Sequence, residues 1–373
     1  MNFKYVVGVD VLGHQANQIQ VAQGISRNTH TASSLLDAPD SIAKAQIINK
    51  LWEPLLVQTH FQNSEHPIGA YWRFYQLECE RALHDNGRHV LERTHQDLLD
   101  IIHSLRKAET RDEIQRALRS KLTKPHDNEE ELLDGSVDFA ANIWLMVDFD
   151  HIQYGFSGRR QLHWKSEPLA KCLCSGFPAS PLLGHEGVKL QRIFNAPNLK
   201  RIARIEIVPT ANLLDHLRII DDDTKLCVFH HVSVLGLQLH NTTFPSGLIE
   251  ETLRTLALLF PQSDTATRDY CRELQASYDI DPQLALCGHL KTDDRQIEKF
   301  IYWHDRLVVL KQAFDEATPR TLAQWWYDRR NGVQWYTFWV AISVVALTLL
   351  FGFIQSVEGA LQVYGTFRGE QHQ

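Results

Sequence analysis

The sequence contains no C-x-x-C pair, no secretory signal and no excess of basic residues. Its six cysteines are scattered, and a chain of 373 residues needs no disulfides to hold a core together, so a reducing compartment fits best. Acidic residues outnumber basic ones by 45 to 38, and the net charge of −7 argues against a nucleic-acid partner, which requires a large basic patch. Asp10 interrupts the short apolar run at the N-terminus, and no cleavage site follows it.

One long uncharged run stands out in an otherwise ordinary composition, which is 44% hydrophobic and 22% charged. The segment 335–354, "WYTFWVAISVVALTLLFGFI", carries no charge, and Thr337, Ser343 and Thr348 can hydrogen-bond to their own helix. Twenty helical residues span about 30 Å, the thickness of the hydrocarbon core of a bilayer. A buried core helix usually keeps a polar stripe, which this segment lacks. We therefore predict a transmembrane helix over 335–355 and a short tail over 356–373.

The residues around this run predict how it lies in the membrane. Trp335, Tyr336 and Trp339 gather at the entry end, as aromatic side chains do at the headgroup level, and Arg329 and Arg330 lie just before them. We expect these five residues to anchor the helix at the interface. Basic residues are more frequent before the run than after it, so the positive-inside rule places the N-terminal domain in the cytosol. The prediction is a tail-anchored, single-pass protein whose direct partner is the lipid bilayer.

Apolar spacing predicts a mostly helical domain of the α+β class with a small sheet. Helices are expected over 42–56, 70–84, 89–108, 134–150 and 247–260, with Ser41 and Ser246 as caps, and an exposed helix and linker over 106–134. Branched apolar residues favour strands at 201–210 and 225–239, and a long helix is expected to start near Asp293. The expected regions are 1–65 (a strand and a helix), 66–148 (helical), 149–290 (mixed), and 291–330 (membrane-proximal helices).

Three groups of residues are candidates for a binding or catalytic site. Asp148 and Asp150 form a D-x-D pair of the kind that holds a divalent cation, although residues two apart do not share a helix face, and a polar turn ending a helix is the alternative. Arg159 and Arg160, in "GFSGRR", are candidate contacts for an anion or an acidic partner, with a simple turn as the alternative.

The third group contains histidines and cysteines. Cys227, His230 and His231 lie in one apolar run, and Cys172-x-Cys174 lies upstream. Zinc requires neighbouring ligand pairs, and the two histidines would point to opposite faces of a strand. We therefore expect hydrogen-bonded core histidines, and we predict no metal and no cofactor.

Several motifs together carry a resemblance to a known family. The stretches "DHLRIIDDDTKLCVFHH", "GFSGRRQLHW" and "YWHDRLVVLKQAF", with the apolar run, resemble an uncharacterised family of single-span membrane proteins from filamentous fungi, over about residues 134–364. Its C-terminal part is distantly similar to CorA-type magnesium transporters, in which a long cytosolic helix leads into the first membrane helix. Unlike those transporters, this chain has no Gly-Met-Asn after the span, since its only methionines are Met1 and Met146.

These observations lead to one expected function and two alternatives. We expect a membrane-anchored protein whose cytosolic domain acts by binding or regulation, as a homo-oligomer or with a protein partner. The first alternative, implied by the resemblance, is a CorA-like subunit that conducts divalent cations. The second is a membrane-anchored enzyme that uses Asp148, Asp150 or the region of His230 and His231.

Overall fold

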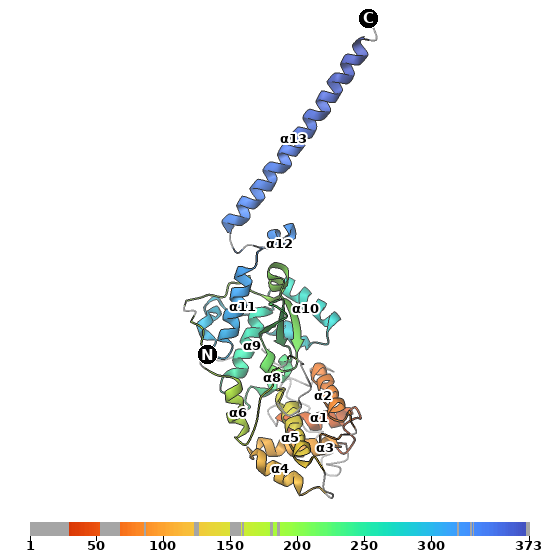
Figure 1. The fold of residues 1–373 in the computed structure, drawn as a ribbon, viewed down its shortest axis with the longest axis vertical. Helices are drawn as coiled ribbons and strands as arrows, with labels where there is room; N and C mark the ends of the chain where they lie inside the picture. The colour runs from red at the N-terminus through yellow and green to blue at the C-terminus, as the bar shows by residue number, and fades with distance from the viewer. Residues whose placement is uncertain are drawn as a thin grey trace, which may run out of the picture.

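A computed structural model describes residues 30–52, 68–85, 87–122, 127–149, 158, 160–179, 182–184, 187–318, 321–328, 330 and 332–370. It shows the predicted class, a mostly helical protein with a small sheet and a long apolar helix at the C-terminal end (Figure 1). Its α-helices are α1 (Ser41–Trp52), α2 (Gly69–Ala82), α3 (His95–Arg106), α4 (Arg111–Arg119), α5 (Glu129–Leu145), α6 (Leu169–Gly176), α7 (Ala196–Asn198), α8 (Val232–Gln238), α9 (Leu248–Leu259), α10 (Thr265–Ser277), α11 (His304–Glu316), α12 (Leu322–Tyr327) and α13 (Gly332–Glu370).

Three helices of the N-terminal half, α1, α3 and α4, begin at side-chain caps. α3 begins with a capping box, in which Thr94 accepts from the Asp97 backbone and Asp97 accepts in return from the Thr94 backbone. α4 begins with the same device. At α1 the predicted cap is wrong, because Asp40, and not Ser41, accepts from the Ala43 N–H at 2.7 Å. Each cap satisfies backbone donors that the first turn leaves without a partner.

α5 is the central helix of the N-terminal half, and it packs against α2, α3 and α4. The prediction of a buried helix here is confirmed, since most of its side chains after the first turn are buried. The helix ends where Met146 adopts a left-handed conformation with φ of 54°. This reversal ends the helix before the D-x-D pair.

The sheet has the order β1-β3-β2 within the described part of the chain. β1 (Glu206–Thr210) runs parallel to β3 (Lys225–Phe229), with Glu206 opposite Lys225, and β2 (Arg218–Ile220) runs antiparallel to β3. β3 is central and mostly buried, whereas β1 is an edge strand. Pro209 has no backbone N–H, and an edge strand tolerates this loss because one of its sides has no partner strand. An exposed turn joins β2 to β3 and carries positive φ at three consecutive aspartates, from Asp221 to Asp223.

Three expectations for the second half are corrected by the structure. The second predicted strand, 225–239, ends at Phe229, and α8 follows it. The first predicted strand, 201–210, begins only at Glu206, because a π-helical turn, η3 (Leu199–Ala203), occupies its start. The N-cap position of α9 is Gly247, which has φ of 85° and supplies no side-chain cap, so Ser246 is not the cap.

The predicted long helix from Asp293 is also wrong. Two short 3₁₀ turns, η6 (Thr292–Arg295) and η7 (Ile297–Lys299), occupy its first part, and α11 begins only at His304. Glu251 explains the break, because its carboxylate accepts from the backbone N–H groups of Ile301 and Trp303, each at 2.8 Å. Two donors held by a side chain from α9 are not available to a continuous helix.

A single hydrophobic core extends from Leu35 to Phe314 and crosses the limits of the predicted regions. α13 lies outside this core and projects away from the domain (Figure 1). The helix is 39 residues long, about 58 Å at the α-helical rise, and it continues past the predicted end at 355 to Glu370. The predicted N-terminal strand near Tyr5 lies outside the described residues.

Candidate functional site: the base of the apolar helix

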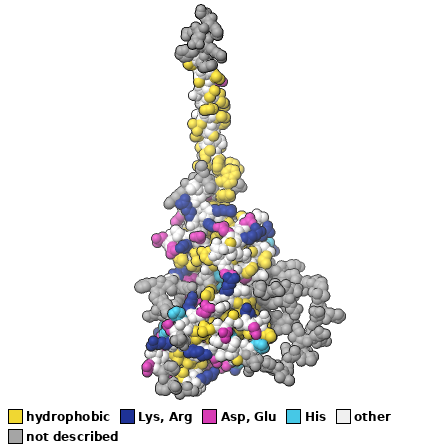
Figure 2. All heavy atoms as spheres, turned by 90° about the vertical axis from the view of Figure 1, so that its right-hand side faces the viewer, with side chains coloured by type: hydrophobic (Ala, Val, Ile, Leu, Met, Phe, Trp, Pro, Cys, Tyr) yellow, Lys and Arg dark blue, Asp and Glu magenta, His cyan; other side chains and the backbone are white. Residues whose placement is uncertain are grey.

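α13 exposes an apolar surface along most of its length. Residues Gly332–Val363 form a helix long and apolar enough to cross a membrane, and its most apolar window is not buried against the rest of the chain. Figure 2 shows hydrophobic side chains along the projecting helix. Leu349, Phe351 and Phe353 are at least 60% exposed, which is far from the usual state of such residues in water. The helix therefore requires an apolar environment that the described domain does not provide.

The polar side chains within α13 are satisfied inside the helix. The hydroxyl groups of Thr337, Ser343 and Thr348 each donate to the carbonyl oxygen four residues earlier, at 2.9, 2.8 and 2.8 Å. This confirms the predicted pattern. A hydroxyl that is paired in this way can enter hydrocarbon without an unsatisfied donor.

Aromatic rings join α12 to the first turns of α13. Trp326 of α12 meets Trp339 edge-on with 5.1 Å between ring centroids, and Trp335 lies 5.1 Å from Tyr336 and 6.2 Å from Trp339. The predicted gathering of aromatics at this end is therefore present. Edge-to-face pairs of this kind contribute about 0.5–1.5 kcal/mol each beyond area burial, so the cluster stabilises the angle between the two helices.

Arg330 joins the base of α13 to the end of α11. Its guanidinium donates to the backbone carbonyls of Phe314, Asp315 and Ala317, and it forms two hydrogen bonds with the Asp328 carboxylate, at 2.8 and 2.7 Å. It also lies over the Phe314 ring, 5.1 Å from the centroid. The last carbonyls of α11 lack helical partners and carry the negative end of its dipole, so a cation is favourable there.

Arg330 is predicted to anchor the helix at the interface, and that stays a prediction; the structure shows in addition that Arg330 connects segments within the protein. Its side chain is only 15% exposed. Sequence reasoning missed this role, although the spacing of Asp328 and Arg330 was a usable signal. The other predicted arginine anchor, Arg329, lies outside the described residues.

α12 is itself fixed to the domain by polar contacts. It begins with a capping box between Thr321 and Gln324, and it packs on η3. Gln324 accepts from the Arg204 guanidinium at 3.5 Å, and the Arg201 guanidinium lies 5.1 Å from the Tyr327 ring centroid. The short helix thus connects η3 and its arginines to the start of the apolar helix.

The D-x-D pair is not described as a unit, because Asp150 lies outside the described residues. Asp148 follows the end of α5, where its N–H donates to Asn212 Oδ1 at 3.2 Å and its carbonyl accepts from the Leu162 N–H at 2.8 Å. Through these backbone contacts Asp148 joins the end of α5 to the segments around Leu162 and Asn212. The alternative interpretation, a polar turn that ends a helix, agrees with the structure.

Arg160 is exposed and lies beside a buried carboxylate, whereas Arg159 lies outside the described residues. The Arg160 N–H donates to Asp215 Oδ1 at 3.1 Å, and Asp215 also pairs with Arg218 at 2.7 Å. Burial, with a smaller contribution from the charge of Arg160, lowers the pKa of Arg306 to about 10. After Arg160, Leu162 forms an isolated β-bridge with Phe149.

The two adjacent histidines stack on one another at the end of β3. Their ring centroids are 3.9 Å apart, so the expectation that they point to opposite faces of a strand is wrong, because the strand ends at Phe229. The Asp281 N–H donates to His230 Nδ1 at 3.2 Å. Burial lowers the pKa of His230 to about 4 and holds that of His231 well below its ordinary value. Both rings lie in the core; His230 is hydrogen-bonded there, as predicted, whereas the Nδ1 atom of His231 has no hydrogen-bond partner in the described structure.

In the part of the chain that the structure describes, no group of three His, Cys, Asp or Glu side chains is placed to hold a metal ion. The described cysteines are free thiols, and all but Cys174 are wholly or partly buried.

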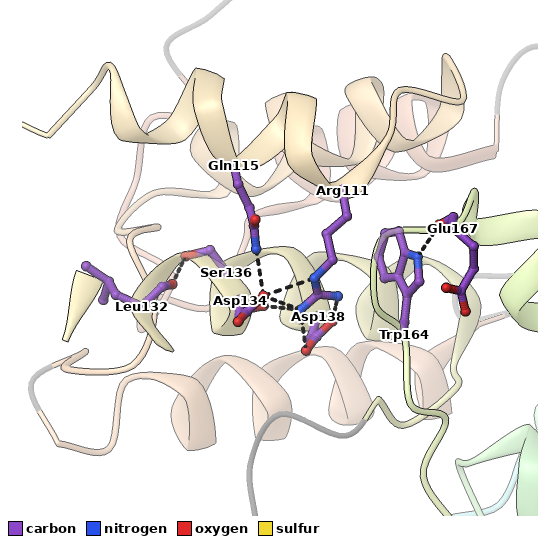
Figure 3. Close-up of polar contacts among 8 residues, drawn as sticks. All are labelled: Arg111, Gln115, Leu132, Asp134, Ser136, Asp138, Trp164 and Glu167. Atoms are coloured by element: carbon purple, nitrogen blue, oxygen red, sulfur yellow. Dashed lines mark hydrogen bonds and ion pairs between the residues drawn. The ribbon is translucent and has the colours of Figure 1, made fainter. Parts of the chain in front are cut away.

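A buried ion cluster joins α4 to α5 (Figure 3). Arg111 donates to Asp138 Oδ1 at 2.5 Å and to Asp134 Oδ1 at 2.7 Å, and its guanidinium lies 4.8 Å from the Trp164 ring centroid. Gln115 adds a bond to Asp134 at 2.6 Å. The segment 106–134 was predicted to be an exposed helix and a linker, yet Arg111 is 5% exposed. The cluster is a structural joint between two helices.

Comparison with known proteins adds no family assignment, since no family model, curated protein or solved structure matches this chain.

Proposed function

We propose that α13 anchors the protein in a membrane and that the domain acts at the surface of that membrane by binding or regulation. The observation that supports this proposal is the continuous exposed apolar surface of Gly332–Val363. At the α-helical rise these 32 residues measure about 48 Å, more than the roughly 30 Å of a hydrocarbon core, so the helix reaches beyond the core or tilts within it. The contacts of Arg330 and of α12 give the domain a defined position relative to this anchor.

The proposed orientation places the domain in the cytosol. Basic residues before the apolar segment 335–355, including Arg329 and Arg330, exceed those after it, where Glu358 and Glu370 accompany Arg368. The test is an epitope at either end of the chain in intact microsomes. An epitope after Gln373 should be protected from protease while one before Met1 is digested, and the reverse pattern would contradict the orientation.

Membrane insertion is tested with a charge at the centre of the helix. Leu347→Arg places a cation where insertion costs about 2.5–3.5 kcal/mol, so much of the variant should leave the membrane fraction in alkaline carbonate. Val333→Arg, at the entry end, is the matched control and should stay with the membrane. Release of the wild type itself would refute the anchor. The alternative of a cation-conducting oligomer predicts a stable higher oligomer in detergent, and a monomer or dimer argues against it.

A further inference from the structure

A basic groove lies on the domain between the loop before α7, the loop between α9 and α10, and the segment before η6. Two adjoining cavities of about 430 and 750 Å³ form it, and both are lined by Gln191, Arg192, Pro261 and Arg295. Lys189 adds a cation to one cavity, and Lys291 adds one to the other. Four cationic side chains therefore line one continuous hollow.

The backbone brings these cations together from distant parts of the sequence. The segments 188–190 and 295–297 pair as a short antiparallel bridge, joined by two backbone hydrogen bonds of 2.8 and 3.0 Å. Lys189 belongs to the first segment and Arg295 to the second. Sequence reasoning missed this group, because its members are about a hundred residues apart in a chain whose net charge is −7.

The positive charges of the groove are not neutralised within the described structure. Among the described residues, no carboxylate forms an ion pair with the side chains of Lys189, Arg192, Lys291 or Arg295. One carboxylate, Asp264, also lines the groove and caps α10, so the lining carries four cationic side chains against one anionic side chain.

Arg295 shows the strongest sign of a missing acceptor. Its Nε–H is buried and has no hydrogen-bond partner in the described structure, while one Nη lies 3.4 Å from Thr292 Oγ1. A buried donor without an acceptor costs about 1–3 kcal/mol. Guanidinium groups match the oxygens of phosphate particularly well.

The groove also lies near the base of the apolar helix. Asn195, Pro197 and Asn198 line one of its cavities, and η3, which follows them directly, is the segment on which α12 packs. Figure 2 shows Lys and Arg side chains on the end of the domain next to the projecting helix. If α13 is the anchor proposed above, this end of the domain faces the membrane surface.

We propose that this basic groove binds phosphate groups, presented either by the headgroups of anionic phospholipids or by a soluble phosphate compound. The position next to the anchor rests on the proposed function, whereas the recognition of phosphate rests on the groove alone. A polybasic site beside a membrane helix gains about 1 kcal/mol per basic residue from an anionic leaflet. The groove would then hold the domain against the membrane that α13 enters.

The test uses the full chain incorporated into phosphatidylcholine nanodiscs and inorganic pyrophosphate as the probe, measured by isothermal titration calorimetry. The variant Lys189→Gln/Arg192→Gln removes two exposed cations that have no carboxylate partner, so folding should be unaffected. Pyrophosphate should bind the wild type, and the double variant should bind roughly tenfold more weakly or not at all. The matched control, Arg88→Gln/Arg272→Gln, removes two exposed arginines outside the groove and should bind as the wild type does.

A second arm identifies the source of the phosphate. Nanodiscs that contain a phosphatidylinositol phosphate should weaken pyrophosphate binding by competition, whereas discs brought to the same surface charge with a fatty acid, which carries no phosphate, should weaken it less. Equal weakening by both lipids would assign the groove to a soluble phosphate compound. No binding to the incorporated wild type, or equal binding by the double variant, would overturn the proposal. Failure of the chain to enter nanodiscs would instead refute the anchor.

Discussion

Glu92 provides the sharpest test of the energetics of this fold. It lies in the loop between α2 and α3, it is 1% exposed, and neither carboxylate oxygen has a hydrogen-bond partner in the described structure. The nearby Ser136 hydroxyl is already committed, since it donates to the Leu132 carbonyl at 2.9 Å and accepts from the Leu91 N–H at 2.7 Å. Burial raises the pKa of Glu92 to about 7.

The sign of the pH dependence follows from this raised pKa. Unfolded Glu92 loses its proton near the ordinary glutamate pKa of 4.5, whereas the folded carboxyl keeps its proton up to about pH 7. Between these values the native state binds more protons, so its stability falls as pH rises. The loss is complete above the folded pKa and amounts to about 3 kcal/mol, from 1.36 kcal/mol for each pH unit.

Glu92→Gln keeps the shape of the protonated side chain and removes its titration. Near pH 5 we expect the variant and the wild type to unfold at almost the same temperature, and near pH 8 we expect the variant to be about 3 kcal/mol more stable, a rise of several degrees. Thermal unfolding of the full chain in detergent, followed by tryptophan fluorescence, measures the unfolding temperatures of the two proteins at both pH values. Glu130→Gln, an exposed residue on α5, is the control. An equal effect at both pH values, or none, would refute the argument.

Three further predictions concern the joints of the protein and its thiols. Arg330→Gln removes the link between α11 and α13 and leaves the Asp328 carboxylate without its partner, so limited proteolysis should cut between α11 and α13 faster. Arg111→Met removes the ion pair that Arg111 forms with Asp138, which is 4% exposed, and should destabilise the domain by about 3–5 kcal/mol in thermal unfolding. Cys174 should react first with a maleimide at neutral pH, because burial raises the pKa of the other thiols.

Each of these predictions has its own check. Arg272→Gln, which breaks an exposed pair with Asp269, should leave the proteolysis pattern unchanged. Arg111→Met/Asp138→Leu should recover most of the stability lost in the single variant, since replacing a buried pair by apolar groups is often neutral. If the double variant is as unstable as the single one, packing and not charge explains the loss. The folded protein is labelled first and denatured only after the maleimide has been quenched, and mass spectrometry should then find the five other thiols unlabelled.

The spacing of apolar and polar side chains predicted those structures that depend on a single continuous segment. The apolar run of α13, its internally bonded hydroxyl groups and the buried face of α5 all follow from side-chain spacing. The caps of α1 and α9 were misplaced by one residue, because Asp40 competes with Ser41, and a left-handed Gly247 needs no side-chain cap. Such boundary errors arise from choices between neighbouring residues that propensity cannot resolve.

Contacts between distant segments were out of reach of the sequence. Glu251 of α9 interrupts the predicted long helix about fifty residues away, and Arg111 is buried only because α5 supplies Asp138. The end of β3 at Phe229 brings the rings of His230 and His231 together where strand alternation would have separated them. In each case a contact or a chain reversal that the local sequence does not show changes which backbone N–H groups are free to form a helix or which side a side chain faces.

The sequence by itself determined that one helix needs an apolar environment, because hydrophobicity and length are properties of a continuous segment. Only the tertiary structure decided how that helix is held, since Arg330 acts through the carbonyl groups of α11 and the carboxylate of Asp328. It also decided where the unpaired cations gather, because the groove is formed by backbone pairing between residues about a hundred positions apart. Charge counted along a chain does not show which charges share a surface, and that sharing depends on the fold.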